Sequence, residues 1–182
     1  MEKLGAFAGL SILLIVVSFR SLIHWRGHGV TRFFAWEGMA WLLVSNLPFW
    51  FRDPFGFSQL FSWLMLFISL YLAIAGAFLL KRKGNAGGTR EDQTLMSFEK
   101  TTGLVETGIY RYIRHPLYSS LLFLTWGIFL KNPVSVLIPV SLFSSLMLYL
   151  TAVKDEKECS EYFGKSYLEY MKKTRMFIPF VF

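Results

Sequence analysis

Five hydrophobic segments alternate with polar stretches along this chain, at residues 4–19, 33–51, 55–80, 117–130 and 134–153. A helix needs about 20 apolar residues to cross the hydrocarbon core of a bilayer. The second, third and fifth segments meet that length, whereas the first and the fourth are short. The pattern predicts an all-α, polytopic membrane protein with about five transmembrane helices.

Two of the polar stretches are short turns that contain proline. Residues 52–54 (Arg-Asp-Pro) join the second segment to the third, and residues 131–133 (Lys-Asn-Pro) join the fourth to the fifth. Links of this kind are typical of antiparallel helices. We therefore expect two helical hairpins within a single domain, residues 1–182, in which 1–100 supply N-terminal helices and a linker.

Lysines and arginines fall unevenly on the two sides of the predicted helices. Sixteen of the 19 lie in residues 20–32, 81–114 and 154–182, which would share one side; Lys3, Arg52 and Lys131 lie on the other. Basic residues favour cytoplasmic loops. We expect the N-terminus outside the membrane and the C-terminus in the cytoplasm, in the inner (cell) membrane if the source is a prokaryote.

The composition agrees with a membrane protein and argues against other classes. Hydrophobic residues make up 54% of the 182 residues and charged residues 17%, against roughly 25% charged residues in soluble domains. The net charge of +7 does not indicate nucleic-acid binding, because the basic residues bracket the hydrophobic segments instead of forming one patch. Cys159 is the only cysteine and the three histidines are scattered, so we expect no disulfide and no metal site.

Residues 155–174, downstream of the fifth segment, have the period of an amphipathic helix. Apolar or aromatic side chains recur on one helical face and charged side chains on the other. The apolar face consists of Cys159, Tyr162, Phe163, Tyr167, Tyr170 and Met171. We expect a C-terminal amphipathic helix in the cytoplasm, lying on the membrane surface or capping the bundle.

Residues 81–102 form a polar link between the third and fourth segments. Its glycines fit neither the dinucleotide fingerprint nor a P-loop, and no predicted strand precedes them. We expect a flexible linker there and no nucleotide site of the Rossmann type.

The densest polar and aromatic chemistry lies in residues 103–118, GLVETGIYRYIRHPLY. The 14-residue segment that follows rises about 21 Å as a helix, against roughly 30 Å of hydrocarbon. If the turn at 131–133 fixes its outer end, His115 and Pro116 lie below the cytoplasmic surface of the membrane. Proline suits the first turn of a helix, and the residue before it prefers extended geometry. Non-helical backbone at that depth must be buried in protein or line a cavity, so we predict a recess in the cytoplasmic leaflet.

Other polar residues have a structural interpretation beside a functional one. Asp155 and Glu156 fall where the fifth helix would leave the membrane, and taken alone such a pair is typical of a solvated helix end. Glu37 can snorkel to the surface or serve a function, and Asn46 can bond between helices. The residues alone leave these alternatives open.

Three stretches together resemble the isoprenylcysteine carboxyl methyltransferase family and its phospholipid-methyltransferase relatives. They are residues 104–118 (LVETGIYRYIRHPLY), the pair Asp155 and Glu156, and residues 162–179 (YFGKSYLEYMKKTRMFIP). Their order and spacing fit: Thr-Gly-x-Tyr, Arg-His-Pro-x-Tyr, a helical hairpin, an acidic pair, Phe-Gly, two tyrosines and an Arg-x-x-Ile-Pro ending. The first hundred residues match only in being transmembrane.

The resemblance implies an integral membrane methyltransferase that binds S-adenosyl-L-methionine on its cytoplasmic side, within residues 101–182. Carried over by position, Thr102, Gly103, Leu104 and Val105 would line the adenosine side, Tyr110 would pack against the cofactor, His115, Pro116, Leu117 and Tyr118 would close around it, and Asp155 and Glu156 would hold its hydroxyl or ammonium groups. Aromatic and acidic side chains suit the cofactor's cationic groups. Arg114 could meet its carboxylate.

Methyl transfer from a sulfonium is an in-line displacement in which positioning dominates, so no side chain need be a nucleophile. Arg114 is the one candidate for a catalytic side chain. We expect His115→Ala and Asp155→Ala each to weaken cofactor binding. His24 and His28 lie in a basic loop, where we expect them to face solvent or lipid headgroups, so His28→Ala should leave binding unchanged.

Two departures from the family pattern bear on the methyl acceptor. Asp155 stands where the family more often has glutamate. Thr151 stands where carboxyl-methylating members carry an arginine, and Lys154 is the nearest cation, which argues against a strict prenylcysteine carboxylate but not against methyl transfer. We expect a lipophilic acceptor that enters from the membrane lipids: the carboxylate of a lipidated thiol compound, or alternatively a phospholipid amine or a thiol. The alternative from another class is a non-catalytic membrane subunit that kept the fold.

Overall fold

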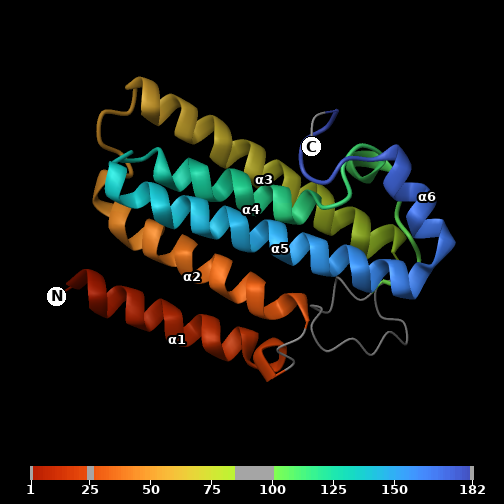
Figure 1. Ribbon diagram of the computed structural model, residues 1–182. Helices are drawn as coiled ribbons and strands as arrows, with labels where there is room; N and C mark the ends of the chain where they lie inside the picture. Colours follow the sequence, from red (N-terminus) through yellow and green to blue (C-terminus); the bar gives the residue numbers. More distant parts are fainter. Residues whose placement is uncertain (1, 24–26, 85–100, 181–182) are drawn as a thin grey trace.

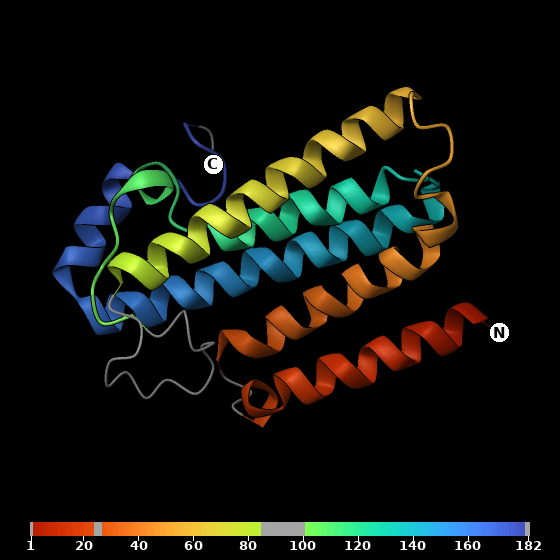
Figure 2. The same ribbon diagram turned by 180° about the vertical axis from the view of Figure 1, so that it is seen from behind.

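The computed structural model describes residues 2–23, 27–84 and 101–180. This part of the chain is built from helices, with one isolated bridge between Ile113 and Arg175 in place of any sheet. The helices are α1 (Glu2–Ile23), α2 (His28–Asn46), η1 (Leu47–Phe49), α3 (Phe57–Lys83), η2 (Gly108–Arg111), α4 (Pro116–Phe129), η3 (Ser135–Leu137), α5 (Ile138–Phe163) and α6 (Lys165–Lys173). Helices α1 to α5 lie side by side along one direction, and α6 crosses one end of the bundle (Figures 1 and 2).

The all-α, polytopic membrane architecture is confirmed. Helices α1 and α3 and the segment Ser135–Phe163 are each long and apolar enough to cross a membrane, and α4 is a shorter apolar helix. The five predicted segments correspond to α1 to α5. The number of spans stays a prediction, because α2 and α4 do not meet the length and hydropathy of a full span.

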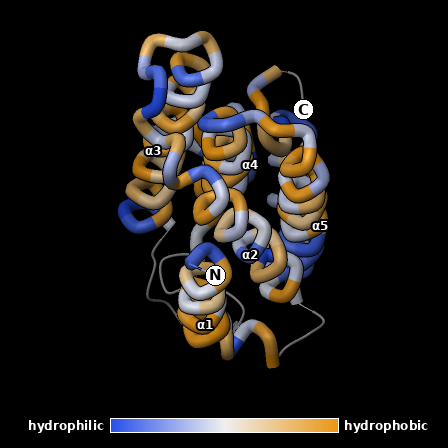
Figure 3. The backbone as a smooth tube through the Cα atoms, turned by 90° about the vertical axis from the view of Figure 1, so that its left-hand side faces the viewer, coloured by the Kyte–Doolittle hydropathy of each residue, from blue (hydrophilic) through white to orange (hydrophobic). Residues whose placement is uncertain are grey.

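Close helix packing relies on small residues at the crossings. Helix α4 packs on α3, α5 packs on α2, and α1 lies at the edge against α2. A Cβ added at Gly38 would lie 2.0 Å from the Ser144 hydroxyl oxygen, and one added at Gly127 would lie 2.9 Å from a Leu66 methyl. Small residues at such crossings let the backbones approach closely, which matters in lipid because the hydrophobic effect does not drive helices together there. Hydrophobic residues predominate along the helices (Figure 3), and many large ones are exposed on the outside of the bundle, as contact with lipid requires.

The described parts of the basic segments that were predicted to share one side lie at one end of the bundle. This end holds the ends of α1, α3 and α5, the beginnings of α2 and α4, and α6 (Figure 1). We call it the basic end. The assignment of the basic end to the cytoplasm stays a prediction from the charge distribution.

The helical boundaries differ from the predicted ones mainly after residue 153. Helix α5 continues to Phe163, so Asp155 and Glu156 lie within it and not beyond it. Gly164 then breaks the chain direction with φ +60°, and α6 covers only Lys165–Lys173. The expected amphipathic helix is thus divided between two helices. Most of the expected linker, residues 85–100, and His24 lie outside the described residues.

The opposite end of the bundle is closed by a buried lysine. Lys131 is 3% exposed, and its Nζ lies 3.6 Å from the centre of the Trp63 ring and donates to Oε1 of Gln59 at 3.0 Å. The Gln59 amide in turn donates to the carbonyls of Phe49 and Lys131, each at 3.0 Å. These contacts fasten the two helical hairpins together.

Candidate functional site

The segment before α4 enters the bundle from the basic end. Pro116 occupies the first turn of α4, and His115 before it has φ −121° and ψ 60°, outside helical geometry. Pro116 and Leu117 pack against Gly76 of α3, where an added Cβ would lie 3.3 and 3.2 Å from them. Gly76 precedes the basic Lys81 by five residues, or about 7.5 Å of helix. The non-helical backbone therefore lies inward of the basic end of α3, and its depth in a membrane stays a prediction.

Residues 174–177, which we call the C-terminal strap, satisfy this buried backbone. The Arg114 N–H donates to the Arg175 carbonyl at 2.8 Å, and the His115 N–H donates to the Met176 carbonyl at 3.2 Å. The Ser119 hydroxyl donates to the Phe177 carbonyl at 2.8 Å. Irregular backbone at membrane depth requires partners within the protein, and the strap supplies them.

A narrow cavity of about 90 Å³ lies where residues 103–118 meet α5 and α6. It collects nine of the eleven predicted cofactor-binding residues: Gly103, Leu104, Val105, Tyr110, His115, Pro116, Leu117, Tyr118 and Asp155. Arg114 also lines it. Thr102 does not line the cavity, and its N–H donates to the Gly84 carbonyl at the end of α3. Glu156 is likewise not among the lining residues.

Glu156 instead holds the charged groups around the cavity. Its Oε1 accepts from Arg114 Nε at 2.6 Å and lies 3.3 Å from His115 Nε2. Nδ1 of His115 faces Asp155 Oδ2 at 3.5 Å. The imidazole of His115 is 6% exposed and is thus held between two neighbouring carboxylates of α5.

The charge state of His115 follows from these neighbours. Burial acts to lower the pKa of the imidazole, but hydrogen bonds to Asp155 and Glu156 and the negative charge of both carboxylates outweigh burial. The pKa of His115 therefore lies above its ordinary value. A charged His115 balances one of the two adjacent carboxylates.

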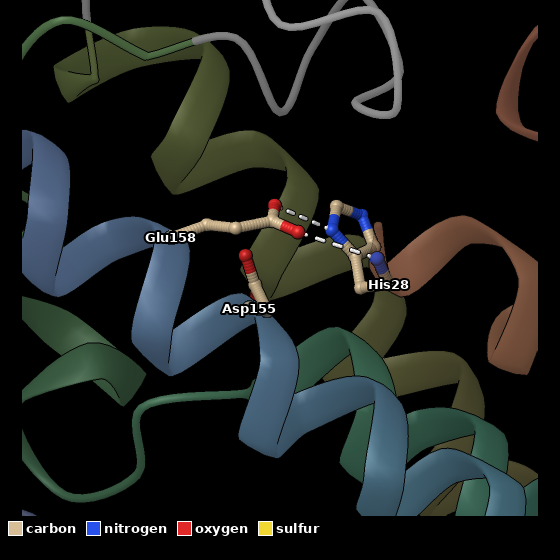
Figure 4. Close-up of side chains that lie close together, drawn as sticks. All are labelled: His28, Asp155 and Glu158. Atoms are coloured by element: carbon tan, nitrogen blue, oxygen red, sulfur yellow. Dashed lines mark hydrogen bonds and ion pairs between the residues drawn. The ribbon is translucent and has the colours of Figure 1, made fainter. Parts of the chain in front are cut away.

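The interpretation of His28 as a loop residue facing solvent or headgroups was wrong. His28 is the first residue of α2 and has no exposed surface. Its Nδ1 lies 2.7 Å from Glu158 Oε2, and its backbone N–H donates to Glu158 Oε1 at 3.2 Å. Figure 4 shows both contacts, with Asp155 beside them. The helix begins earlier than its apolar segment because Arg32 is buried too, with its guanidinium over the Trp36 ring at 5.3 Å.

His28, Asp155 and Glu158 also offer ligand atoms within 4.8 Å of one another. The 2.7 Å between Nδ1 and Oε2 is the distance of a charge-assisted hydrogen bond, and Nε2, across the ring from Glu158, makes no hydrogen bond within the described part of the chain. We therefore interpret the group as an ion-paired cluster.

Sequence reasoning missed six cavity residues: Leu80, Thr101, Cys159, Phe163, Tyr167 and Tyr170. Four of them belong to the apolar face that was predicted for residues 155–174. The period alone did not distinguish a membrane-facing helix from one that covers a cavity. Tyr170 faces the cavity, and its hydroxyl donates to the Tyr110 carbonyl at 2.6 Å.

The structure is thus a polytopic helical bundle with a cavity between an Arg-His-Pro turn and Asp155 of α5. Comparison with protein families matches residues 57–166 to the phospholipid methyltransferase family. The match covers more than half of the chain, and the protein belongs to this family. The family recognised in the sequence is thereby confirmed.

The chain is also similar to individual proteins that are named isoprenylcysteine methyltransferases. The chain is 28% identical over 128 residues to a probable protein-S-isoprenylcysteine O-methyltransferase of Oryza sativa subsp. indica, covering 65% of this chain and 63% of the relative. It is 30% identical over 128 residues to protein-S-isoprenylcysteine O-methyltransferase A of Arabidopsis thaliana, covering 65% and 61%. The Saccharomyces cerevisiae enzyme is 37% identical over 82 residues, covering 43% and 33%. The chain thus spans less than two thirds of these relatives' length. No solved structure matches it.

Proposed function

We propose that this protein is an S-adenosyl-L-methionine-dependent methyltransferase of the isoprenylcysteine carboxyl methyltransferase type. It would transfer a methyl group to a lipophilic acceptor at the cytoplasmic side of the membrane. The observation that carries the proposal is the meeting of residues 103–118 with Asp155 around one cavity, in a chain that belongs to a methyltransferase family.

The groups around the cavity suit this cofactor in chemistry. The Asp155 carboxylate can accept from an ammonium or a ribose hydroxyl, and Val105, Leu117 and Tyr118 offer an apolar wall to an adenine ring. Ligand pockets typically measure about 300–1,000 Å³, so the cavity of about 90 Å³ must widen to admit a nucleoside. Tyr167, on the short helix α6, lines the cavity and can move with that helix.

When bound, the cofactor supplies a methyl group already activated by its sulfonium. The chain itself supplies position and charge. Asp155 and His115 fix the polar side of the site, and Glu156 and Arg114 hold His115 from behind. Tyr167 and Tyr170, 4% and 3% exposed, shield the cavity from water. Both ring nitrogens of His115 face carboxylates, so the imidazole serves position and not proton removal.

A second, apolar groove next to the cavity suits the acceptor's chain. It measures about 310 Å³ and is lined mainly by apolar side chains, among them Met65, Leu122, Phe123 and Trp126. Phe177 of the C-terminal strap lines the groove and has its ring centre 6.2 Å from that of His115. A lipid chain in this groove would place its polar end beside His115. A carboxylate acceptor has no proton to lose on methylation, so it needs no general base. This agrees with a site in which both ring nitrogens of His115 already face carboxylates.

The direct test is titration of the purified protein, in detergent or nanodiscs, with S-adenosyl-L-methionine by calorimetry. We expect binding, and we expect Asp155→Asn to weaken it at least tenfold. Asp53→Asn is the matched control, because Asp53 lies in the turn before α3 at the far end of the bundle and should leave affinity unchanged. Absence of binding at millimolar cofactor would refute the proposal.

The acceptor is identified by supplying isotope-labelled cofactor with membrane extracts and locating the labelled methyl group by mass spectrometry. Label in base-labile esters of lipidated thiol compounds supports the carboxylate acceptor. Label in phospholipid amines or in thioethers moves the protein to another branch of the family. Cofactor binding without formation of S-adenosylhomocysteine would indicate a non-catalytic subunit.

A further inference from the structure

Glu158 of α5 closes the beginning of α2. The residue before α2, Gly27, has no side chain with which to cap the helix. Glu158 accepts from the backbone N–H and faces the ring Nδ1 of the same residue, His28. A carboxylate at a helix N-terminus accepts from an N–H that has no partner within the helix, and its negative charge interacts favourably with the helix dipole. We call this two-point contact the His28–Glu158 clamp.

The clamp lies directly beside the proposed cofactor site. Glu158 follows Asp155 by three residues, so both project from one face of α5. The ligand atoms of His28, Asp155 and Glu158 lie within 4.8 Å of one another, and Asp155 also faces His115 at 3.5 Å. Asp155 therefore stands between two histidines, one from α2 and one from the Arg-His-Pro turn.

Histidines and carboxylates lie close together through this region: His28 contacts Glu158, with Asp155 nearby, and His115 lies between Asp155 and Glu156. Without the imidazole of His28, Glu158 would lose the hydrogen bond that fixes its carboxylate and could move closer to Asp155. Two carboxylates at such a distance repel, and one of them shifts away or takes up a proton. Either change would disturb the carboxylate that lines the cavity.

We propose that His28 is a positioning residue for the cofactor site, which holds Glu158 back so that Asp155 alone faces the cavity. This inference rests on the proposed function. It assigns a role to α2, which lies outside the family match at residues 57–166, and it reverses the expectation that His28→Ala leaves binding unchanged.

The test compares cofactor affinities by calorimetry in four proteins. His28→Ala is expected to raise the Kd for S-adenosyl-L-methionine at least tenfold. His28→Asn, whose side-chain N–H can take the place of Nδ1–H, is expected to stay within threefold of the wild type. The matched control is Thr151→Val: the Thr151 hydroxyl donates to Thr31 at 2.9 Å, so this variant removes another α2–α5 contact. It keeps the Thr31 bond to the His28 carbonyl and should leave Kd unchanged.

A double-mutant cycle with Glu158→Ala tests whether the two residues act as one clamp. Residues that act through one contact have non-additive effects, so the double variant should bind no more weakly than His28→Ala alone. Circular dichroism checks that each variant is folded, and if His28→Ala does not fold, Glu158→Ala and His28→Asn decide the question.

Wild-type affinity in folded His28→Ala, or an equal loss in Thr151→Val, overturns the inference while leaving the proposed function intact. A wild-type protein that binds no cofactor overturns both.

Discussion

Substitution of Arg114 can distinguish a positioning role of this residue from a catalytic one. Its guanidinium is bound on three sides: Nε donates to Glu156 at 2.6 Å, and a terminal nitrogen donates to the Thr174 carbonyl at 2.5 Å and to the Met171 carbonyl at 3.3 Å. The Arg114 and Glu156 side chains are only 10% and 12% exposed. Arg114 thereby joins α5, the end of α6 and the C-terminal strap.

The expected cost of Arg114→Ala follows from these contacts. Removing one partner of a buried ion pair destabilises a protein by about 3–5 kcal/mol. Glu156 keeps His115 at 3.3 Å, which favours the lower end of that range. The lost bonds to two carbonyls add to the loss, at about 1 kcal/mol for each. We expect the free energy of unfolding to fall by roughly 5 kcal/mol, and by less in Arg114→Lys, which keeps the charge but not the planar fork.

The assay is reversible unfolding in mixed micelles, followed by circular dichroism, together with turnover at saturating cofactor. Arg111→Ala is the matched control, since Arg111 is exposed on η2 and should change neither quantity. If Arg114→Ala unfolds like the wild type while turnover collapses, Arg114 acts on the reacting groups and the positioning argument is wrong.

Three further predictions concern other parts of the bundle. Because the pKa of His115 is raised, the stability that its charged form contributes is fully present below about pH 6.5 and is lost as pH rises through the higher folded-state pKa. Unfolding assays on the wild type should show this loss of stability over that pH window. An equally steep loss in His115→Asn would contradict the prediction. Cys159 lines the cavity and is the only cysteine, so S-adenosylhomocysteine should slow its alkylation in proportion to occupancy, measured by intact mass; unchanged rates at saturation would place the ligand elsewhere. Lys131→Met should lower stability by about 2–3 kcal/mol through the lost cation–π contact and hydrogen bond while leaving cofactor affinity unchanged, and an affinity loss would show that the far end of the bundle is coupled to the cavity.

The positions of the helices could be predicted from the sequence because apolar length is the main requirement of a membrane span. What the pattern could not predict is where a helix ends once charged residues are buried. Helix α2 begins before its apolar segment because Arg32 lies over Trp36, and α5 continues past it because Asp155 and Glu156 face His115. In both helices a paired charge behaves as part of the core.

The candidate site was predictable to the extent that it is local in sequence. Residues 103–118 and the acidic pair could be recognised from their order and spacing, and the cavity brings nine of the eleven predicted residues together. His28 gave no such signal, because a histidine near basic residues at a helix start is typical of a headgroup-facing position. Its partner, Glu158, is distant in sequence, and that pairing depends on how α2 packs against α5.

The contacts that hold the candidate site extend beyond the residues that match the family. The family match ends at residue 166 and begins at residue 57, yet His28 lies before it and the C-terminal strap lies after it. The strap satisfies the buried N–H groups of Arg114 and His115, and an unpaired buried N–H costs about 1–3 kcal/mol. A fragment of residues 57–166 would therefore contain the recognisable motifs without the contacts that hold them in place. The site requires α2 and the strap as well as the residues by which the family is recognised.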